Sequence, residues 1–371
     1  MGGLDALVPL LAIAAAALAC LALLFYWLAG VRKPLRLRRI SHNPVLRPLS
    51  ESWWQSEAVF NPAAFVHDGR VHLLYRALGR DGISRIGHAS SADGVHFTER
   101  SASPVFDKKP EFLPPPAVSY ATLTYDADAY ASGGGWGGVE DPRAVVLDDR
   151  IYMSFGLFES WQSMRLAVTS IAHIDFDARE WKWAPHVAMS PRGQTNKNWV
   201  LFPQKINGKF ALLHALTPKI LIQYVDDLSE LAEHPIQSNN HRSGRPGHWD
   251  ALIRGAGAPP IRTEYGWLLL YHGTDPEKNS GYNVGAMLLD LHDPSHILYQ
   301  SISPMLSPEE WYENEWKAGV VYASGAVVFK GDLIVYYGGG DKYVAAAKMN
   351  LRDFLAKLTT HQNAVLEPIK V

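Results

Sequence analysis

Apolar residues recur along most of this 371-residue chain in short runs, and each run follows a tight turn. Five of the runs are rich in strand-forming side chains and carry an aromatic residue or a histidine near their end. They span residues 71–76, 151–156, 210–214, 267–273 and 333–338. Because β-branched and aromatic side chains fit a pleated, half-buried surface, each run is predicted to be a β-strand entered from a tight turn.

A second run, rich in small residues, follows each of the first five. These second runs span residues 86–93, 166–170, 220–226, 284–290 and 344–349. One antiparallel pair therefore recurs five times, at intervals of roughly 60–80 residues, as stacked repeat architectures require. The pattern predicts an all-β protein with the fold of a five-bladed β-propeller. A β-sandwich is the competing architecture, but it does not account for a strand pair repeated at such long spacing.

The N-terminal region has a different pattern, because it is apolar throughout from Ala6 to Gly30. Roughly 20 apolar residues suffice to cross a bilayer as a helix, so one transmembrane helix is predicted. No Lys or Arg precedes the run, which favours an anchor over a cleaved signal peptide. Basic residues cluster directly after it, between 32 and 39, and by the positive-inside rule they place the rest of the chain on the cytoplasmic side of the membrane.

This division gives three segments: a transmembrane anchor over residues 1–30, a basic juxtamembrane linker over 31–51 and a catalytic propeller over 52–371. The only cysteine, Cys20, lies within the predicted anchor, so the propeller has no disulfide.

Composition excludes several classes of function. The net charge is −2 and only 19% of residues are charged, so the basic footprint of a nucleic-acid-binding protein is missing. The fifteen histidines are scattered without the paired spacing of a metal site, and the glycine-rich segment 133–138 lacks the features of a nucleotide loop. We therefore expect no metal and no cofactor. Twelve tryptophans and sixteen tyrosines suit a protein that stacks on sugar rings, although a strand-rich core explains them equally well.

One stretch combines charge with backbone stiffness: Glu140, Asp141, Pro142 and Arg143 directly precede the apolar run 144–147. Proline fixes its own φ and restricts the residue before it, so Asp141 is expected in a single backbone geometry. Alone, this stretch is also compatible with an ordinary Asp-Pro turn that has an arginine counter-ion.

Charged residues near the ends of the repeated strands extend the candidate site, because propellers bind ligands at the central channel. They are Arg76, Asp81, Glu159, His214, His272, Asp275 and Asp341. A ring of carboxylates with a few cations suits glycoside cleavage, in which an acid protonates the leaving oxygen. Surface charges or salt bridges between blades are the alternative interpretation of each residue taken singly.

Seven ordered motifs between Val59 and about Met349 resemble glycoside hydrolase family 130, the mannoside phosphorylases and related β-mannosidases. They lie at residues 59–64, 75–87, 138–143, 196–209, 255–261, 271–273 and 336–341. The resemblance implies a five-bladed propeller that acts on oligosaccharides by an inverting, single-displacement attack on a β-mannosidic bond. It also implies that Asp141 is the general acid and protonates the leaving oxygen through a hydroxyl of the mannosyl ring.

Other residues receive roles beside that acid. A carboxyl that donates a proton near neutral pH needs a raised pKa, and the adjacent Glu140 is expected to supply the like charge that raises it. By the resemblance Asn61, Arg76 and Asp341 hold the non-reducing mannose. Asp81 and Arg143 are two further candidates for the substrate site. Arg143 is expected to orient the carboxylates rather than to touch substrate.

The expected nucleophile pocket departs from the family pattern. Phosphorylases surround inorganic phosphate, their co-substrate, with basic side chains. Lys197 and His272 match two such positions, but Ala215 and Ile253 stand where the family has cations. Two arginines could take the place of these cations, namely Arg254 or Arg192.

These losses favour water as the nucleophile, and thus a hydrolase with a carboxylate base. The candidates for the base are Glu159, Glu313 and Glu315. A phosphorylase that releases a sugar 1-phosphate is the alternative, and a glycan-binding propeller without catalysis is a further one. Another five-bladed glycosidase family would need an early aspartate where Ala63 follows Asn61-Pro62.

Overall fold

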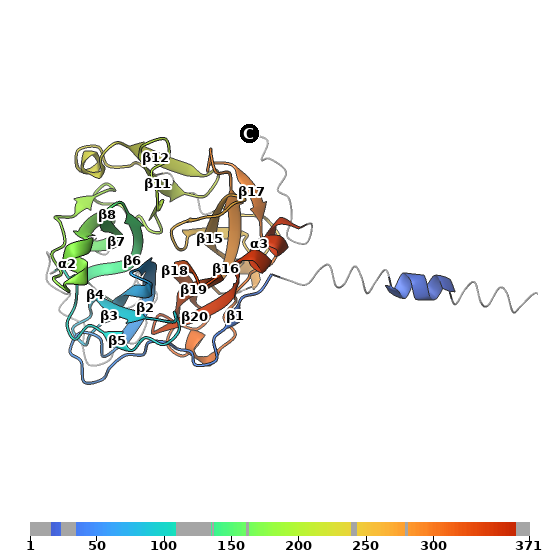
Figure 1. Ribbon diagram of the computed structural model, residues 1–371, viewed down its shortest axis with the longest axis horizontal. Coiled ribbons are helices and arrows are strands. Elements are labelled where there is room, and N and C mark those ends of the chain that lie inside the picture. The colour runs from blue at the N-terminus through green and yellow to red at the C-terminus, as the bar shows by residue number, and fades with distance from the viewer. Residues whose placement is uncertain are drawn as a thin grey trace, which may run out of the picture.

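The computed structural model describes residues 16–23, 35–108, 135, 137–160, 163–238, 243–278 and 281–360. Its strands group into antiparallel units arranged round a central axis (Figure 1). The first unit contains β2 (Ala58–His67), β3 (Arg70–Leu78), β4 (Ile83–Ser91) and β5 (Glu99–Arg100). The second contains β6 (Gly137–Leu147), β7 (Arg150–Ser160), β8 (Ser163–Ala172) and β9 (Val187–Ala188). The third contains β10 (Val200–Leu201), β11 (Phe210–Ala215) and β12 (Leu221–Val225).

The other two units complete the ring. They contain β13 (Leu252–Ala256), β14 (Ile261–Arg262), β15 (Trp267–Thr274), β16 (Asn283–Leu289) and β17 (Ile297–Gln300); and β18 (Val321–Phe329), β19 (Asp332–Gly339) and β20 (Tyr343–Asn350) together with β1 (Arg38–Arg39). Short helices connect or flank the strands: α2 (His173–Asp177), η1 (Leu228–Ala232), η2 (Pro276–Lys278), η3 (Trp311–Glu313) and α3 (Leu351–Thr359). The mostly-β class predicted from the sequence is confirmed, and the five repeated strand pairs correspond to β3–β4, β7–β8, β11–β12, β15–β16 and β19–β20.

The strands that begin each unit were not recognised from the repeat, although they carry much of the candidate site. Two of them, β2 and β6, are continuous through an Xaa-Pro pair. Each has a register shift at that point, between Phe60 and Ala63 in β2 and between Glu140 and Arg143 in β6. The predicted Asp-Pro turn is therefore a β-bulge inside a strand, and such bulges re-aim side chains.

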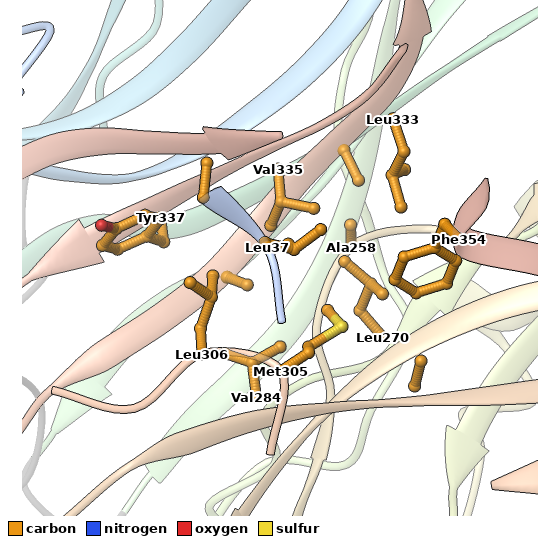
Figure 2. Packing of buried hydrophobic residues seen from close by; sticks show 14 of the residues in the cluster. Leu37, Ala258, Leu270, Val284, Met305, Leu306, Leu333, Val335, Tyr337 and Phe354 are labelled. Atoms are coloured by element: carbon orange, nitrogen blue, oxygen red, sulfur yellow. The ribbon is translucent and has the colours of Figure 1, made fainter. Parts of the chain in front are cut away.

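The N-terminal part of the body closes the ring. β1 pairs antiparallel with β20, with Arg38 opposite Lys348. Beside it, Leu37 packs in a buried cluster with Leu270 and Val284 from the fourth unit and Val335 from the fifth (Figure 2). Burying these side chains between neighbouring units joins the two ends of the chain's body without a covalent link.

The predicted anchor over residues 6–30 lies mostly outside the described residues. Residues 16–23 form a short helix there. Within the described parts of the chain, no helix combines the length and the apolar character needed to cross a membrane.

Candidate functional site

Two bulges bring the first pair of site residues together. Asn61 and Asp141 have φ values of 47° and 48°, in the left-handed region that Asn and Asp tolerate better than most other residues. In this geometry Asn61 Nδ2 donates a hydrogen bond of 2.8 Å to Asp141 Oδ1. Gly338 in β19 makes room for this contact, because a Cβ there would lie 2.0 Å from Asn61 Oδ1. The glycine of the Tyr-Tyr-Gly motif is thus required by the site itself.

Arg76 links both acidic residues of the β6 bulge. Its buried guanidinium donates to Asp141 Oδ1 at 3.2 Å and forms an ion pair of 3.1 Å with Glu140 Oε1. Its third nitrogen, Nε, donates to Ser84 Oγ at 2.9 Å. Three directed contacts fix a planar fork of donors in one orientation. The first and second units therefore share one charged network.

The pKa of Asp141 differs from the expectation. Burial of the carboxyl, whose side chain is 15% exposed, acts to raise the pKa. The positive charges of Arg76, Arg143 and Lys197 and the hydrogen bond from Asn61 outweigh burial, so the pKa lies below its ordinary value of 3.8. The raised pKa expected from the adjacent Glu140 is therefore not found, and Arg76 pairs with both carboxylates. Asp141 is ionised here at neutral pH.

Arg143 stabilises the β6 bulge through several hydrogen bonds. Its Nη1 donates to the backbone oxygen of Asp141 at 2.7 Å, and its Nε donates to the backbone oxygen of Gly257 at 3.1 Å. Its Nη2 donates to Tyr322 Oη at 2.8 Å and to Asn198 Oδ1 at 3.2 Å. One guanidinium thus connects the second unit to the three units that follow it.

A group of cationic and aromatic side chains adjoins these contacts. Lys197 and Asp141 line the same small pocket, which has a volume of about 10 Å³. His272 stacks on the ring of Tyr322, with the two ring centroids 4.3 Å apart. Burial and the neighbouring Arg143 lower the pKa of His272 to about 3, so its ring is neutral.

Arg254 completes this group, since its guanidinium lies 5.1 Å from the centroid of the Tyr282 ring. The backbone oxygen of Arg254 accepts a hydrogen bond of 2.9 Å from Asn198 Nδ2. Ala215 and Ile253, where cations were expected, are buried apolar residues. Arg254 follows Ile253 directly and brings a cation to the same part of the site, whereas Arg192 forms an ion pair of 3.0 Å with Glu159.

Asp341 lies in the turn between β19 and β20 of the fifth unit and also has a left-handed φ, of 54°. Its carboxylate contributes to the electrostatic field at Arg76. Lys317 Nζ forms an ion pair of 3.0 Å with Asp341 Oδ2. Sequence reasoning missed Lys317, because it lies outside the repeated strands and no local motif marks it.

The three candidate bases have other partners. Buried Glu313 accepts Arg39 Nε and Nη2, Tyr337 Oη and the backbone nitrogens of Glu309 and Glu310. Both oxygens of Glu313 are used by these donors, which link β1 and η3.

Glu159 and Glu315 are likewise engaged. Glu159 accepts from Ser163 Oγ at 3.0 Å and pairs with Arg165 and Arg192. Glu315 forms contacts of 2.9 Å with Lys342 and 2.7 Å with Tyr343 Oη.

Asp81 lies at the turn between β3 and β4. Its two oxygens accept hydrogen bonds of 3.0 and 2.6 Å from Arg85. Asp81 directly precedes β4, the strand in which Ser84 contacts Arg76.

A metal site is not formed among the residues that the structure describes, since no group of three or more potential ligands gathers there.

Comparison with known proteins identifies the family of this chain. The profile of glycoside hydrolase family 130, described as β-1,4-mannooligosaccharide phosphorylase, matches residues 129–360. A 1,2-β-oligomannan phosphorylase from Thermoanaerobacter sp. (strain X514) is 35% identical over 330 residues, which cover 86% of this chain and 99% of that protein.

Solved structures give the same result. The β-1,2-mannobiose phosphorylase from Listeria innocua, solved with β-1,2-mannobiose, superposes with a TM-score of 0.64 and 25% identity, over 87% of this chain and 99% of that one. A structure described with glycoside hydrolases that target β-1,2-mannosidic linkages in Candida mannan has a TM-score of 0.66 and 24% identity, over 91% of this chain and 97% of that one, and supports the fold. The chain therefore belongs to glycoside hydrolase family 130, the family of the β-mannoside phosphorylases.

Proposed function

We propose that this enzyme is a phosphorylase of β-1,2-linked mannooligosaccharides. The observation that carries the proposal is the group of cations near Asp141 and His272: Lys197 and Arg143 act on the carboxyl of Asp141, and Arg143 and Arg254 act on the ring of His272. A phosphate dianion needs such charges to leave water and to be aimed at a carbon atom. The relatives named as β-1,2-oligomannan and β-1,2-mannobiose phosphorylases support both the reaction and the linkage.

This proposal replaces the preference for hydrolysis that the sequence suggested. That preference depended on Ala215 and Ile253, and it assumed that the missing cations had no substitutes. Arg254 weakens the assumption, because it lies beside His272 and Tyr282. Hydrolysis by inversion also requires a carboxylate base, and the three candidates have the structural partners described above.

The mannosyl unit to be transferred is assigned to the network of Asn61, Arg76 and Asp341. These residues come from the first and fifth units: Asn61 and Arg76 donate to Asp141, and Asp341 acts on Arg76. Their amide, guanidinium and carboxylate groups supply both donors and acceptors, which a ring with several hydroxyl groups needs. Lys317 acts through Asp341 as a positioning residue.

In the proposed reaction, a phosphate oxygen forms a bond to the anomeric carbon while the glycosidic carbon–oxygen bond breaks. The leaving oxygen receives the proton of Asp141, relayed through a hydroxyl of the mannosyl ring as the family resemblance implies. The products are α-mannose 1-phosphate and an oligosaccharide shorter by one unit. Inversion follows because nucleophile and leaving group occupy opposite faces of the ring.

The lowered pKa of Asp141 fits this scheme if phosphate binds first or together with substrate. A dianion near Lys197 and Arg143 offsets the positive charge that now holds the carboxyl ionised. Phosphate binding should therefore raise the pKa of Asp141 and load it with the proton that the reaction consumes.

The direct test is a phosphate titration. The rate of β-1,2-mannobiose cleavage by the purified enzyme should be negligible without phosphate and rise to saturation as phosphate is added. A rate independent of phosphate would reject phosphorolysis and restore hydrolysis. Absence of any turnover, together with binding of the disaccharide, would favour a glycan-binding protein.

We also propose that residues 6–30 anchor the enzyme in a membrane, with its catalytic body in the cytoplasm. The apolar run and the basic residues that follow it support this proposal. The full chain should sediment with membranes and resist an alkaline wash, while its body should be protected from protease added outside intact cells. Release by the wash, or digestion of the body in intact cells, would contradict the proposal.

A further inference from the structure

We propose that a second pocket, at the turn between β3 and β4, binds sugar units of the oligosaccharide beyond the bond that is cleaved. This inference rests on the proposed function for its class of substrate. The pocket has a volume of about 450 Å³ and combines an exposed indole with serine hydroxyls and charged groups. Its lining residues are Ser50, Glu51, Ser52, Trp53, Ser56, Arg80 and Asp81.

Trp53 and the next residue, Trp54, differ in solvent exposure. Trp54 is fully buried, donates from Nε1 to the backbone oxygen of Ala102 at 3.1 Å and stacks on Tyr75 with centroids 6.3 Å apart. Trp53 is 62% exposed. An exposed indole offers a flat apolar face on which a ligand can stack.

The indole of Trp53 is held on a well-packed support. A Cβ at Gly79 would lie 2.3 Å from the backbone oxygen of Trp53, so the 50–56 segment packs directly on the β3–β4 turn. The guanidinium of Arg85 lies 4.7 Å from the ring centroid of Trp53. Arg85 is itself fixed by its two hydrogen bonds to Asp81. One side of the indole therefore has a fixed partner, while much of the ring stays accessible.

The chemistry of the pocket suits a neutral ligand with many hydroxyl groups. Glu51, Asp81 and Arg80 line the pocket, and Asp81 is already paired with Arg85, so a ligand meets groups of both charges there. The carbon–hydrogen faces of a sugar ring pack on an aromatic side chain, and its hydroxyls pair with nearby hydroxyl, carboxylate and guanidinium groups. A strongly anionic or cationic ligand would meet like charge here.

The pocket is tied to the catalytic network through one strand. Next to Arg85 in β4, Ser84 accepts the hydrogen bond from Arg76, which in turn contacts Asp141. In addition, Ile83 pairs with Gly137 at the start of the strand that carries Asp141. The Trp53 pocket and Asp141 are thus joined by contacts through the same end of the first unit. A longer oligosaccharide held at Asp141 could extend along this end to the indole.

The test compares short and long substrates in the full-length enzyme at saturating phosphate. In Trp53→Ala, kcat/KM for β-1,2-mannotetraose should fall about tenfold, which corresponds to about 1.4 kcal/mol, while kcat/KM for β-1,2-mannobiose should stay unchanged. The loss should lie in KM, and Trp53→Phe should recover most of it. Trp311→Ala is the matched control, because Trp311 is also exposed and also lies under an arginine, Arg47.

Equal losses on both substrates, or no loss on either, would overturn the inference. If the wild-type enzyme turns over no mannoside, the proposed function fails, and calorimetry with mannotetraose then decides on the pocket separately. Binding that weakens in Trp53→Ala but not in Trp311→Ala would support the pocket in that case. Binding unaffected by Trp53→Ala, or no binding to the wild type, would refute it.

Discussion

Replacing Asp141 by asparagine separates its role in the reaction from its role in the fold. The amide has nearly the same shape as the carboxyl, and asparagine tolerates the φ of 48° at this position. Its oxygen can keep the hydrogen bond from Asn61. The amide carries no proton that it can give to a leaving oxygen, so the variant tests acid catalysis while keeping the bulge.

The size of each effect follows from the contacts. In Asp141→Asn, Arg76 loses the charge of Asp141 but keeps the ion pair of 3.1 Å with Glu140 and the hydrogen bond to Ser84. Removing one partner of a buried charge pair costs about 3–5 kcal/mol when nothing replaces it, so the remaining partner should limit the loss to about 1–3 kcal/mol. General acid catalysis contributes about 10²–10⁴ in rate, and kcat should fall by that factor.

The assay measures kcat for phosphorolysis of β-1,2-mannobiose and of an aryl β-mannoside whose phenol leaves without much protonation. The deficit of Asp141→Asn should be much smaller for the aryl substrate, since its leaving group needs little help from an acid. Asp141→Ala should lose activity to a similar extent but unfold at a lower temperature, because alanine fits a left-handed backbone poorly. Wild-type kcat in Asp141→Asn, or equal deficits for both substrates, would refute the assignment.

Three further predictions follow from the charges of the site. The stability that Asp141 contributes through its lowered pKa is present above pH 3.8 and is lost as the pH falls below that value. The difference in free energy of unfolding between wild type and Asp141→Asn should therefore become smaller on acidification. A difference that stays constant with pH in urea unfolding would contradict this. Arg254→Gln should raise the KM for phosphate about tenfold to a hundredfold, while Arg262→Gln on the exposed neighbouring strand should leave it unchanged; equal KM values for both variants would remove Arg254 from the phosphate site. Glu313→Gln should lower the free energy of unfolding by about 3–5 kcal/mol, because an amide cannot accept all the donors that now include Arg39, and an unchanged melting temperature would disprove that structural role.

The outer strands of the fold could be predicted from the sequence, but the strands beside the axis could not. β3, β7 and β15 are long runs of apolar residues after tight turns, which local patterning detects. β2 and β6 contain a proline and a bulge, and proline normally argues against a strand. The functional side chains lie at these interruptions, where a local rule fails because the site requires a special geometry.

The candidate site was partly predictable for a similar reason. The Glu-Asp-Pro-Arg motif marked Asp141, yet nothing local indicates that Arg76 neutralises both acidic residues or that Lys317 pairs with Asp341. Glu313 appeared to be a candidate base because its partner Arg39 is 274 residues away in sequence. Such long-range pairs determine pKa values and roles, and only the folded arrangement shows them.

The most direct test of the account is phosphorus NMR of the wild-type enzyme with β-1,2-mannobiose and inorganic phosphate. The account predicts that the phosphate signal decreases and that α-mannose 1-phosphate appears in equal amount to the mannose released from the reducing end. Complete cleavage to mannose with the phosphate signal unchanged would contradict it, because water would then be the nucleophile that attacks the anomeric carbon.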